Sequence, residues 1–168
     1  TGPEVKGAAA SFEWYPALVH PGSYFICAND CHNGIYATRG AYERSGPYDT
    51  SYKIVADFKW IMTCMDAGMT LVYTREVSVN YSLGGASGDA HNHSVECMRV
   101  VQERFPSLAP FEVSGLYHCF FGFAKVADES EPPADRMAFL RKVFTRHASD
   151  ADFLSALHWA MIETLKHP

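Results

Sequence analysis

The segment YKIVADFKWIMTCMDA, residues 52–67, has the clearest helical pattern in the chain and decides how the rest is interpreted. Its apolar residues recur at i, i+3, i+4 and i+7, at Ile54, Val55, Phe58, Ile61, Met62 and Met65. This spacing predicts an amphipathic helix with one face in a core. Gly68 follows directly and suits the C′ position, where helices often end in glycine.

Shorter elements flank this helix on both sides. Upstream, residues 34–37 predict a short strand, and Thr38 is a good N-cap for a short helix over residues 39–44. Downstream, residues 69–73 and 77–81 predict two more short strands.

Three further helices are predicted in the second half of the chain. The first covers residues 91–104 and is stopped by Pro106, and the others cover residues 136–146 and 150–166. Asp150-Ala151-Asp152 begins the last of them, and we interpret these acids as N-terminal capping residues. The elements together predict an α/β class, α+β for the chain as given, rich in helices with a few short strands. A polar, proline-containing stretch over 128–135 divides the chain into a domain, 1–127, and a C-terminal helical extension, 128–168.

Composition excludes several classes of protein. The net charge is −5 and no basic run occurs, whereas nucleic-acid binding needs clustered Lys and Arg. No stretch of about 18 apolar residues is present to span a membrane. Cys27, Cys31 and His32 suggest zinc, but no second close pair of ligands follows. Five cysteines without disulfide-scaffold density favour reduced thiols in the cytoplasm.

Four short motifs occur in a fixed order between residues 31 and 87. They read CHNGIY (31–36), GPYD (46–49), ADFKW (56–60) and YSLGGAS (81–87). In this order they resemble the second, acceptor-side half of family 2 glycosyltransferases of GT-A type, especially bacterial exopolysaccharide and colanic-acid enzymes. The match covers about a third of the chain. Asn33 departs from the glutamine common at its position.

This resemblance implies a fold, an activity and a setting. The fold would be a partial GT-A fold whose N-terminal nucleotide-binding half is absent, because no Asp-x-Asp precedes the motifs. The complete enzyme would transfer a sugar from a nucleotide-sugar donor to a glycan or lipid-linked acceptor, with inversion, using divalent Mg²⁺ or Mn²⁺. It would act in the cytoplasm, peripherally on the inner face of the plasma membrane. We expect the fragment alone to be inactive.

Asp57 is the candidate catalytic base. It occupies the first turn of the predicted helix, after the apolar pair Val55-Ala56 and beside Phe58. Partial burial raises a carboxylate pKa toward neutrality, as a base for an acceptor hydroxyl requires, while the helix N-terminus favours the anion. The resemblance places Asp57 at the base position of the family. The alternative is that Asp57 only caps the helix or is a surface residue at its start.

The other candidates surround this position. We expect His32, Asp49, Trp60 and Tyr36 to shape the substrate-binding site, although Asp49 also suits a turn and both aromatic residues also suit a core. In many GT-A enzymes a histidine downstream of the base completes a metal site, which makes His91 the metal candidate here. A helix-capping or solvated role is the alternative for His91.

Two other functions remain open. One is a non-catalytic carbohydrate-binding or oligomerisation module, which the missing nucleotide-binding half favours. The other is a metal-dependent hydrolase using His91, His93 and Cys31. A cut sheet would also expose an apolar edge, so we expect a homo-oligomer unless that edge is covered.

Overall fold

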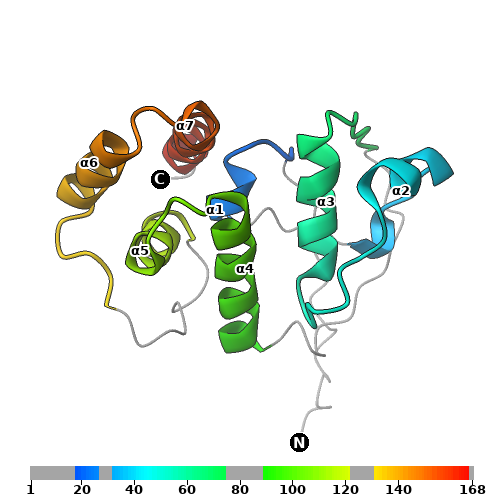
Figure 1. The fold of residues 1–168 in the computed structure, drawn as a ribbon, viewed down its shortest axis with the longest axis horizontal. Coiled ribbons are helices and arrows are strands. Elements are labelled where there is room, and N and C mark those ends of the chain that lie inside the picture. Colours follow the sequence, from blue (N-terminus) through cyan, green and yellow to red (C-terminus); the bar gives the residue numbers. More distant parts are fainter. Residues whose placement is uncertain (1–17, 27–31, 75–88, 122–130, 167–168) are drawn as a thin grey trace, which may run out of the picture.

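The computed structural model describes residues 18–26, 32–74, 89–121 and 131–166 of the 168-residue chain. In order, the helices are α1 Ser23–Ile26, the 3-10 helix η1 His32–Gly34, α2 Arg39–Ser45, α3 Ala56–Asp66, α4 Ala90–Arg104, α5 Pro110–Phe120, α6 Arg136–Arg146 and α7 Ala151–Lys166. Figure 1 shows α1 and α4 in the middle, with α2 and α3 on one side and α5, α6 and α7 on the other.

The described part of the chain contains no strand, so the predicted α/β class, and the partial GT-A fold with it, is wrong for these residues. Residues 34–37 and 69–73 do not pair with any strand there. The physical reason lies in their apolar side chains: Ile35, Ala37 and Met69 pack against the α3 residues Trp60, Ile61 and Cys64 instead. Packing on α3 buries these side chains without a sheet. The third predicted strand, 77–81, lies outside the described residues.

Most predicted helices are confirmed. Thr38 caps α2, with its Oγ1 accepting the Ala41 N–H at 3.2 Å. Gly68 follows α3 with a φ of +67°. Asp150 caps α7 by accepting the Phe153 N–H at 3.0 Å. None of the helices in the described ranges combines the length and the apolarity that crossing a membrane requires.

One main core joins most of the helices. Phe25 of α1 is fully buried, and its ring lies within 5.6 to 6.4 Å of the rings of Phe105, Phe120 and Phe153. These contacts tie α1 to the end of α4, to α5 and to α7, and buried residues of α3 complete the cluster. Gly22, just before α1, lies so close to α7 that an added Cβ would come within 2.4 Å of the Ala160 nitrogen. The core therefore fixes α3 and α4 relative to the rest of the molecule.

Candidate functional site

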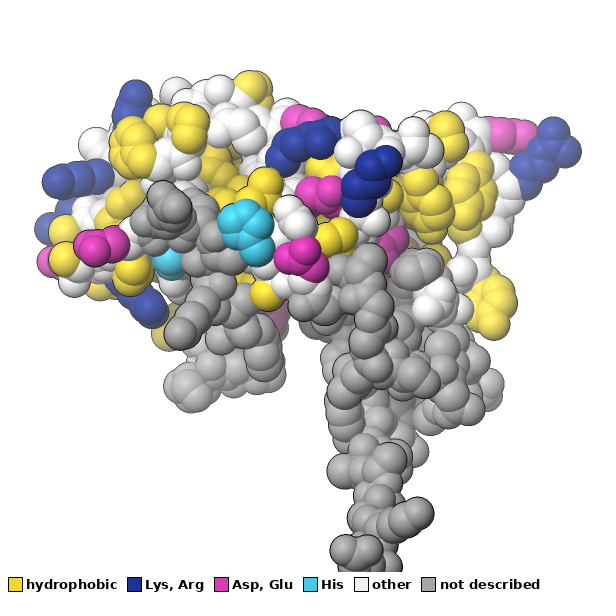
Figure 2. Space-filling view, turned by 90° about the horizontal axis from the view of Figure 1, so that it is seen from below, with side chains coloured by type: hydrophobic (Ala, Val, Ile, Leu, Met, Phe, Trp, Pro, Cys, Tyr) yellow, Lys and Arg dark blue, Asp and Glu magenta, His cyan; other side chains and the backbone are white. Residues whose placement is uncertain are grey.

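Helices α3 and α4 both begin at the lower end of the molecule in Figure 1. Figure 2 looks at this end and shows histidine and acidic side chains close together near the middle of the face. Asp57 is the second residue of α3 and is partly buried. Its Oδ1 accepts the backbone N–H of Phe58 at 2.8 Å. The structure thus places the candidate base where polar groups of two helices meet.

Glu96 of α4 holds the beginning of α3. Its carboxylate accepts the backbone N–H groups of Lys53, Ile54 and Val55 at 2.8, 2.8 and 3.0 Å. Val55 is the N-cap of α3 and has no side-chain cap of its own. Partial burial pushes the pKa of Glu96 upward, but the three N–H donors and Arg99 outweigh it, so the pKa lies below its ordinary value. Glu96 is therefore an anion that acts as a cap supplied by another helix.

This contact also explains where α3 begins. The apolar spacing predicted a helix from residue 52, but the structure begins α3 at Ala56. Because the N–H groups of residues 53–55 point to Glu96, the backbone there does not continue the helix. The later start makes Asp57 the second residue of the helix.

His93 of α4 lies close enough to Asp57 for the charge of the carboxylate to act on its ring. Its ring stacks on Phe121, with ring centroids 6.2 Å apart, and its Nδ1 lies 3.8 Å from the sulfur of Cys97. Burial lowers the pKa of His93, and the negative charges of Asp57 and Glu96 oppose this effect only in part. The imidazole is therefore neutral at neutral pH. Asp57 has a polar but uncharged neighbour on this side.

An aromatic cluster lies on the other side of Asp57. Trp60 is only 5% exposed, and its Nε1–H donates to the Gly46 carbonyl at 2.8 Å. The rings of Tyr42 and Tyr48 lie 4.8 and 5.5 Å from it. Burial, helped by Tyr42 and to a smaller degree by Asp57, raises the pKa of Tyr48 to about 12. Trp60 is thus placed in a packed cluster that joins α2 to α3.

Asp49 takes part in a charged network next to this cluster. Its Oδ1 accepts the Ser51 N–H at 2.9 Å, and its Oδ2 lies 2.8 Å from Lys59 Nζ. Lys59 also contacts Glu103 of α4 at 2.6 Å. The hydrogen bonds from Lys59 and Ser51 hold the pKa of Asp49 well below its usual range. Asp49 positions the turn before α3 and stays ionised.

The remaining candidates are Tyr36, His91 and His32. Tyr36 is 85% exposed, and His91 is exposed in the first turn of α4. His32 belongs to η1. No group of three or more His, Cys, Asp or Glu side chains that could hold a metal ion occurs among the described residues, and His91 stays a metal candidate from the sequence alone. Cys27 and Cys31 lie outside the described residues.

Sequence reasoning missed Glu96 altogether and considered His93 only as a metal ligand or as a solvated or helix-capping residue. The predicted helix began at residue 52, so nothing in the sequence indicated that Val55 is the N-cap and needs an acceptor from elsewhere. Glu96, which supplies this acceptor, is 41 residues away from Val55. The site that results is a carboxylate beside a neutral imidazole in partly buried surroundings, which suits a proton acceptor.

Comparisons with protein-family models, with curated proteins and with solved structures gave no match to this chain.

Proposed function

We propose that this chain is the acceptor-side part of an inverting, nucleotide-sugar-dependent glycosyltransferase resembling family 2, with Asp57 as its catalytic base. The observation that carries the proposal is the placement of Asp57. It lies partly buried in the first turn of α3, where its charge reaches His93, while Glu96 rather than Asp57 binds the N–H groups that precede the helix. Asp57 itself accepts the N–H of Phe58 within the first turn.

In this proposal Asp57 takes the proton of an acceptor hydroxyl while the oxygen of that hydroxyl attacks the anomeric carbon of the donor. The bond from that carbon to the nucleotide diphosphate breaks, and the diphosphate leaves with the electron pair. A cation next to the base would favour its anion and weaken it as a proton acceptor. The neutral state of His93 avoids this effect while keeping a polar partner beside Asp57.

The donor and its metal belong to the rest of the enzyme in this proposal. We assign the nucleotide-sugar site, with Mg²⁺ or Mn²⁺, to a separate nucleotide-binding part of the enzyme, as the resemblance to family 2 implies. The acceptor would be a glycan or a lipid-linked sugar. The same proposal places the enzyme in the cytoplasm, on the inner face of the plasma membrane.

The test measures UDP and GDP release from a panel of nucleotide sugars by the complete enzyme. Asp57→Asn keeps the shape and loses the base, so we expect turnover to fall roughly a hundredfold or more, with kcat affected more than KM. Asp57→Glu keeps a carboxylate and should retain more activity than Asp57→Asn. Full activity of Asp57→Asn contradicts the assignment.

A non-catalytic carbohydrate-binding module is the alternative for the same chain. The exposed ring of Tyr36 is the observation that favours it, since flat aromatic faces stack on sugars. If the wild-type enzyme releases no nucleotide from any donor but the chain binds oligosaccharides, this alternative replaces the transferase.

A further inference from the structure

Helix α7 has a buried face and, beside it, a stripe of four residues that recur at helical spacing. The buried face packs into the main core and consists of Phe153, Ala156, Leu157 and Ala160. The stripe residues are spaced by four, three and four positions: Leu154, His158, Met161 and Leu165. At about 100° per residue these four lie within a sector of about 60°, roughly 120° around the helix from the buried face. This is the spacing of the contact seam between two packed helices.

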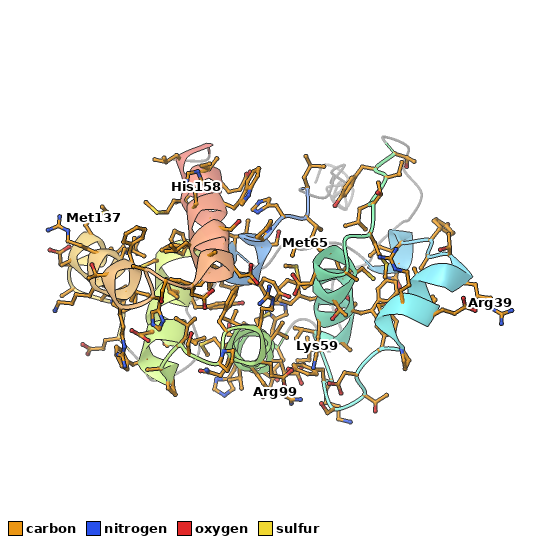
Figure 3. The ribbon with its side chains drawn as sticks, turned by 45° about the horizontal axis from the view of Figure 1, so that its top comes forward. Arg39, Lys59, Met65, Arg99, Met137 and His158 are labelled. Atoms are coloured by element: carbon orange, nitrogen blue, oxygen red, sulfur yellow. The ribbon has the colours of Figure 1, made fainter. Side chains whose placement is uncertain are left out.

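The stripe becomes more exposed toward the C-terminal end of α7. Leu154 is half-buried against the main core, whereas His158 is exposed, Met161 is 39% exposed and Leu165 is 79% exposed. Figure 3 shows His158 on α7, at the opposite edge of the molecule from Arg99 of α4. Single exposed apolar residues are ordinary, but a contiguous exposed stripe indicates an interaction surface.

The stripe carries no fixed charge. The charged residues of α7 are Asp152, Glu163 and Lys166, and each lies more than about 100° from the centre of the stripe. Asp152 contacts Arg104 at 2.9 Å, and Glu163 Oε1 lies 3.7 Å from His20 Nε2, so both acids belong to a different flank of the helix. The stripe therefore offers no cation to lipid phosphates and no ion pair to a charged partner. A partner with an equally uncharged, regularly spaced face fits it best.

We propose that the stripe is the contact surface between two copies of this chain, whose α7 helices pack antiparallel about a two-fold axis. The spacing of the stripe is the same in both directions. An antiparallel copy therefore places Leu154 against the partner's Leu165, and His158 against the partner's Met161. A thioether beside an aromatic ring is a favourable contact. The inference stands on α7 and does not rest on the proposed sugar transfer.

A parallel arrangement of the two helices is less favourable. It would bring the acidic helix starts of both copies together, each with Asp150 and Asp152. The antiparallel arrangement instead places each start beside the C-terminal end of the other helix, where the helix dipoles are complementary. The stripe is only roughly 16 Å long. Because the contact is small, we expect a reversible dimer whose population depends on concentration.

The test is analytical ultracentrifugation of the chain over a series of concentrations, in which the wild type should change from monomer to dimer. His158→Lys and Met161→Glu each bring two like charges together at the two-fold axis, so each should weaken the dimer roughly tenfold or more. A mixture of these two variants should dimerise again, because the new cation of one copy faces the new acid of the other. The matched controls are Val72→Lys and Val72→Glu, at a side chain that is 85% exposed outside the stripe. Both should dimerise as the wild type does.

Three results would overturn the proposal. The first is a wild-type chain that stays monomeric at every concentration; if that monomer sediments with phospholipid vesicles, the stripe binds a bilayer instead. The second is a dimer that His158→Lys and Met161→Glu leave unchanged, which assigns the dimer to another surface. The third is a mixture of the two variants that stays monomeric, which contradicts the antiparallel pairing. Unchanged urea midpoints show that the variants fold, since the replaced side chains are exposed.

Discussion

The tripeptide Ala-Asp-Phe begins two helices of this molecule, α3 at Ala56 and α7 at Ala151, and the two Asp residues have different surroundings. In both helices the Phe is buried: Phe58 is 6% exposed and Phe153 is fully buried. In α7 the Asp152 side chain is 71% exposed and contacts Arg104 at 2.9 Å. In α3 the Asp57 side chain is partly buried beside His93.

The difference comes from how each helix is capped. Asp150 caps α7 from the adjacent sequence, so the start of that helix is complete on its own. Helix α3 has no local cap and depends on Glu96 of α4, which brings His93 with it because the two residues lie on adjacent turns. A cap supplied by another helix thus brings polar side chains around Asp57, and a local cap leaves Asp152 in solvent.

The largest effect on stability should come from replacing the buried Phe that is the third residue of both helices. Phe58→Ala and Phe153→Ala each remove a buried ring, so each should lower the free energy of unfolding by about 3–5 kcal/mol. We expect Phe153→Ala to lie at the upper end, because three rings lie within 6 Å of Phe153. Urea denaturation measures both. A much larger loss for Phe58→Ala would mean that the main core is centred on α3.

The cap from Glu96 should be next in size. Glu96→Ala leaves three backbone N–H groups without their charged acceptor, and we expect a loss of about 2–3 kcal/mol. Glu96→Gln keeps one acceptor oxygen and should lose about half of that. A loss below about 0.5 kcal/mol in Glu96→Ala would show that water replaces the carboxylate and that α3 needs no cap from α4.

The local cap of α7 gives the matching measurement. Asp150→Ala removes one hydrogen bond to the Phe153 N–H and should lower stability by about 1 kcal/mol. Amide hydrogen exchange should quicken at the start of α7 and stay unchanged at the start of α3. Faster exchange at both helices would contradict the distinction between a local and a distant cap.

The smallest effect should appear in the pH dependence of stability. Burial lowers the pKa of His93 below its ordinary value of 6.5. As the pH falls through 6.5, the unfolded chain binds this proton before the folded chain does, so stability decreases. His93→Gln should remove this part of the slope in urea titrations between about pH 5 and 7. An unchanged slope would mean that His93 is solvated.

Local features of the fold were readable from the sequence. Thr38 and Asp150 cap their helices by accepting an N–H three residues further on, and Gly68 follows α3 with a positive φ. Each of these roles was predicted from the neighbouring sequence alone. Helix α5 was missed because six consecutive residues, 112–117, are all buried. Such a helix has no polar face, so no helical periodicity appears in its sequence.

Features that depend on distant residues were not readable. The strand predicted over residues 69–73 has a suitable composition, but its Met69 packs on α3 and no strand of the described residues pairs with it. The spacing predicted that Asp57 lies on this helix, whereas the helix start at Ala56 and the roles of Glu96 and His93 required the fold that brings α4 to α3. Trp60 illustrates the same limit, because only the structure shows its packing against Tyr42 and Tyr48.

The most direct test of the central claim measures kcat/KM for nucleotide release by the complete enzyme in Asp57→Asn and Asp152→Asn side by side. The two substitutions are the same change at the second residue of two helices that begin with the same tripeptide. We predict a loss of roughly a hundredfold or more for Asp57→Asn and activity within about twofold of wild type for Asp152→Asn, with similar urea midpoints. Equal activities of the two variants would contradict the claim that Asp57 is the base.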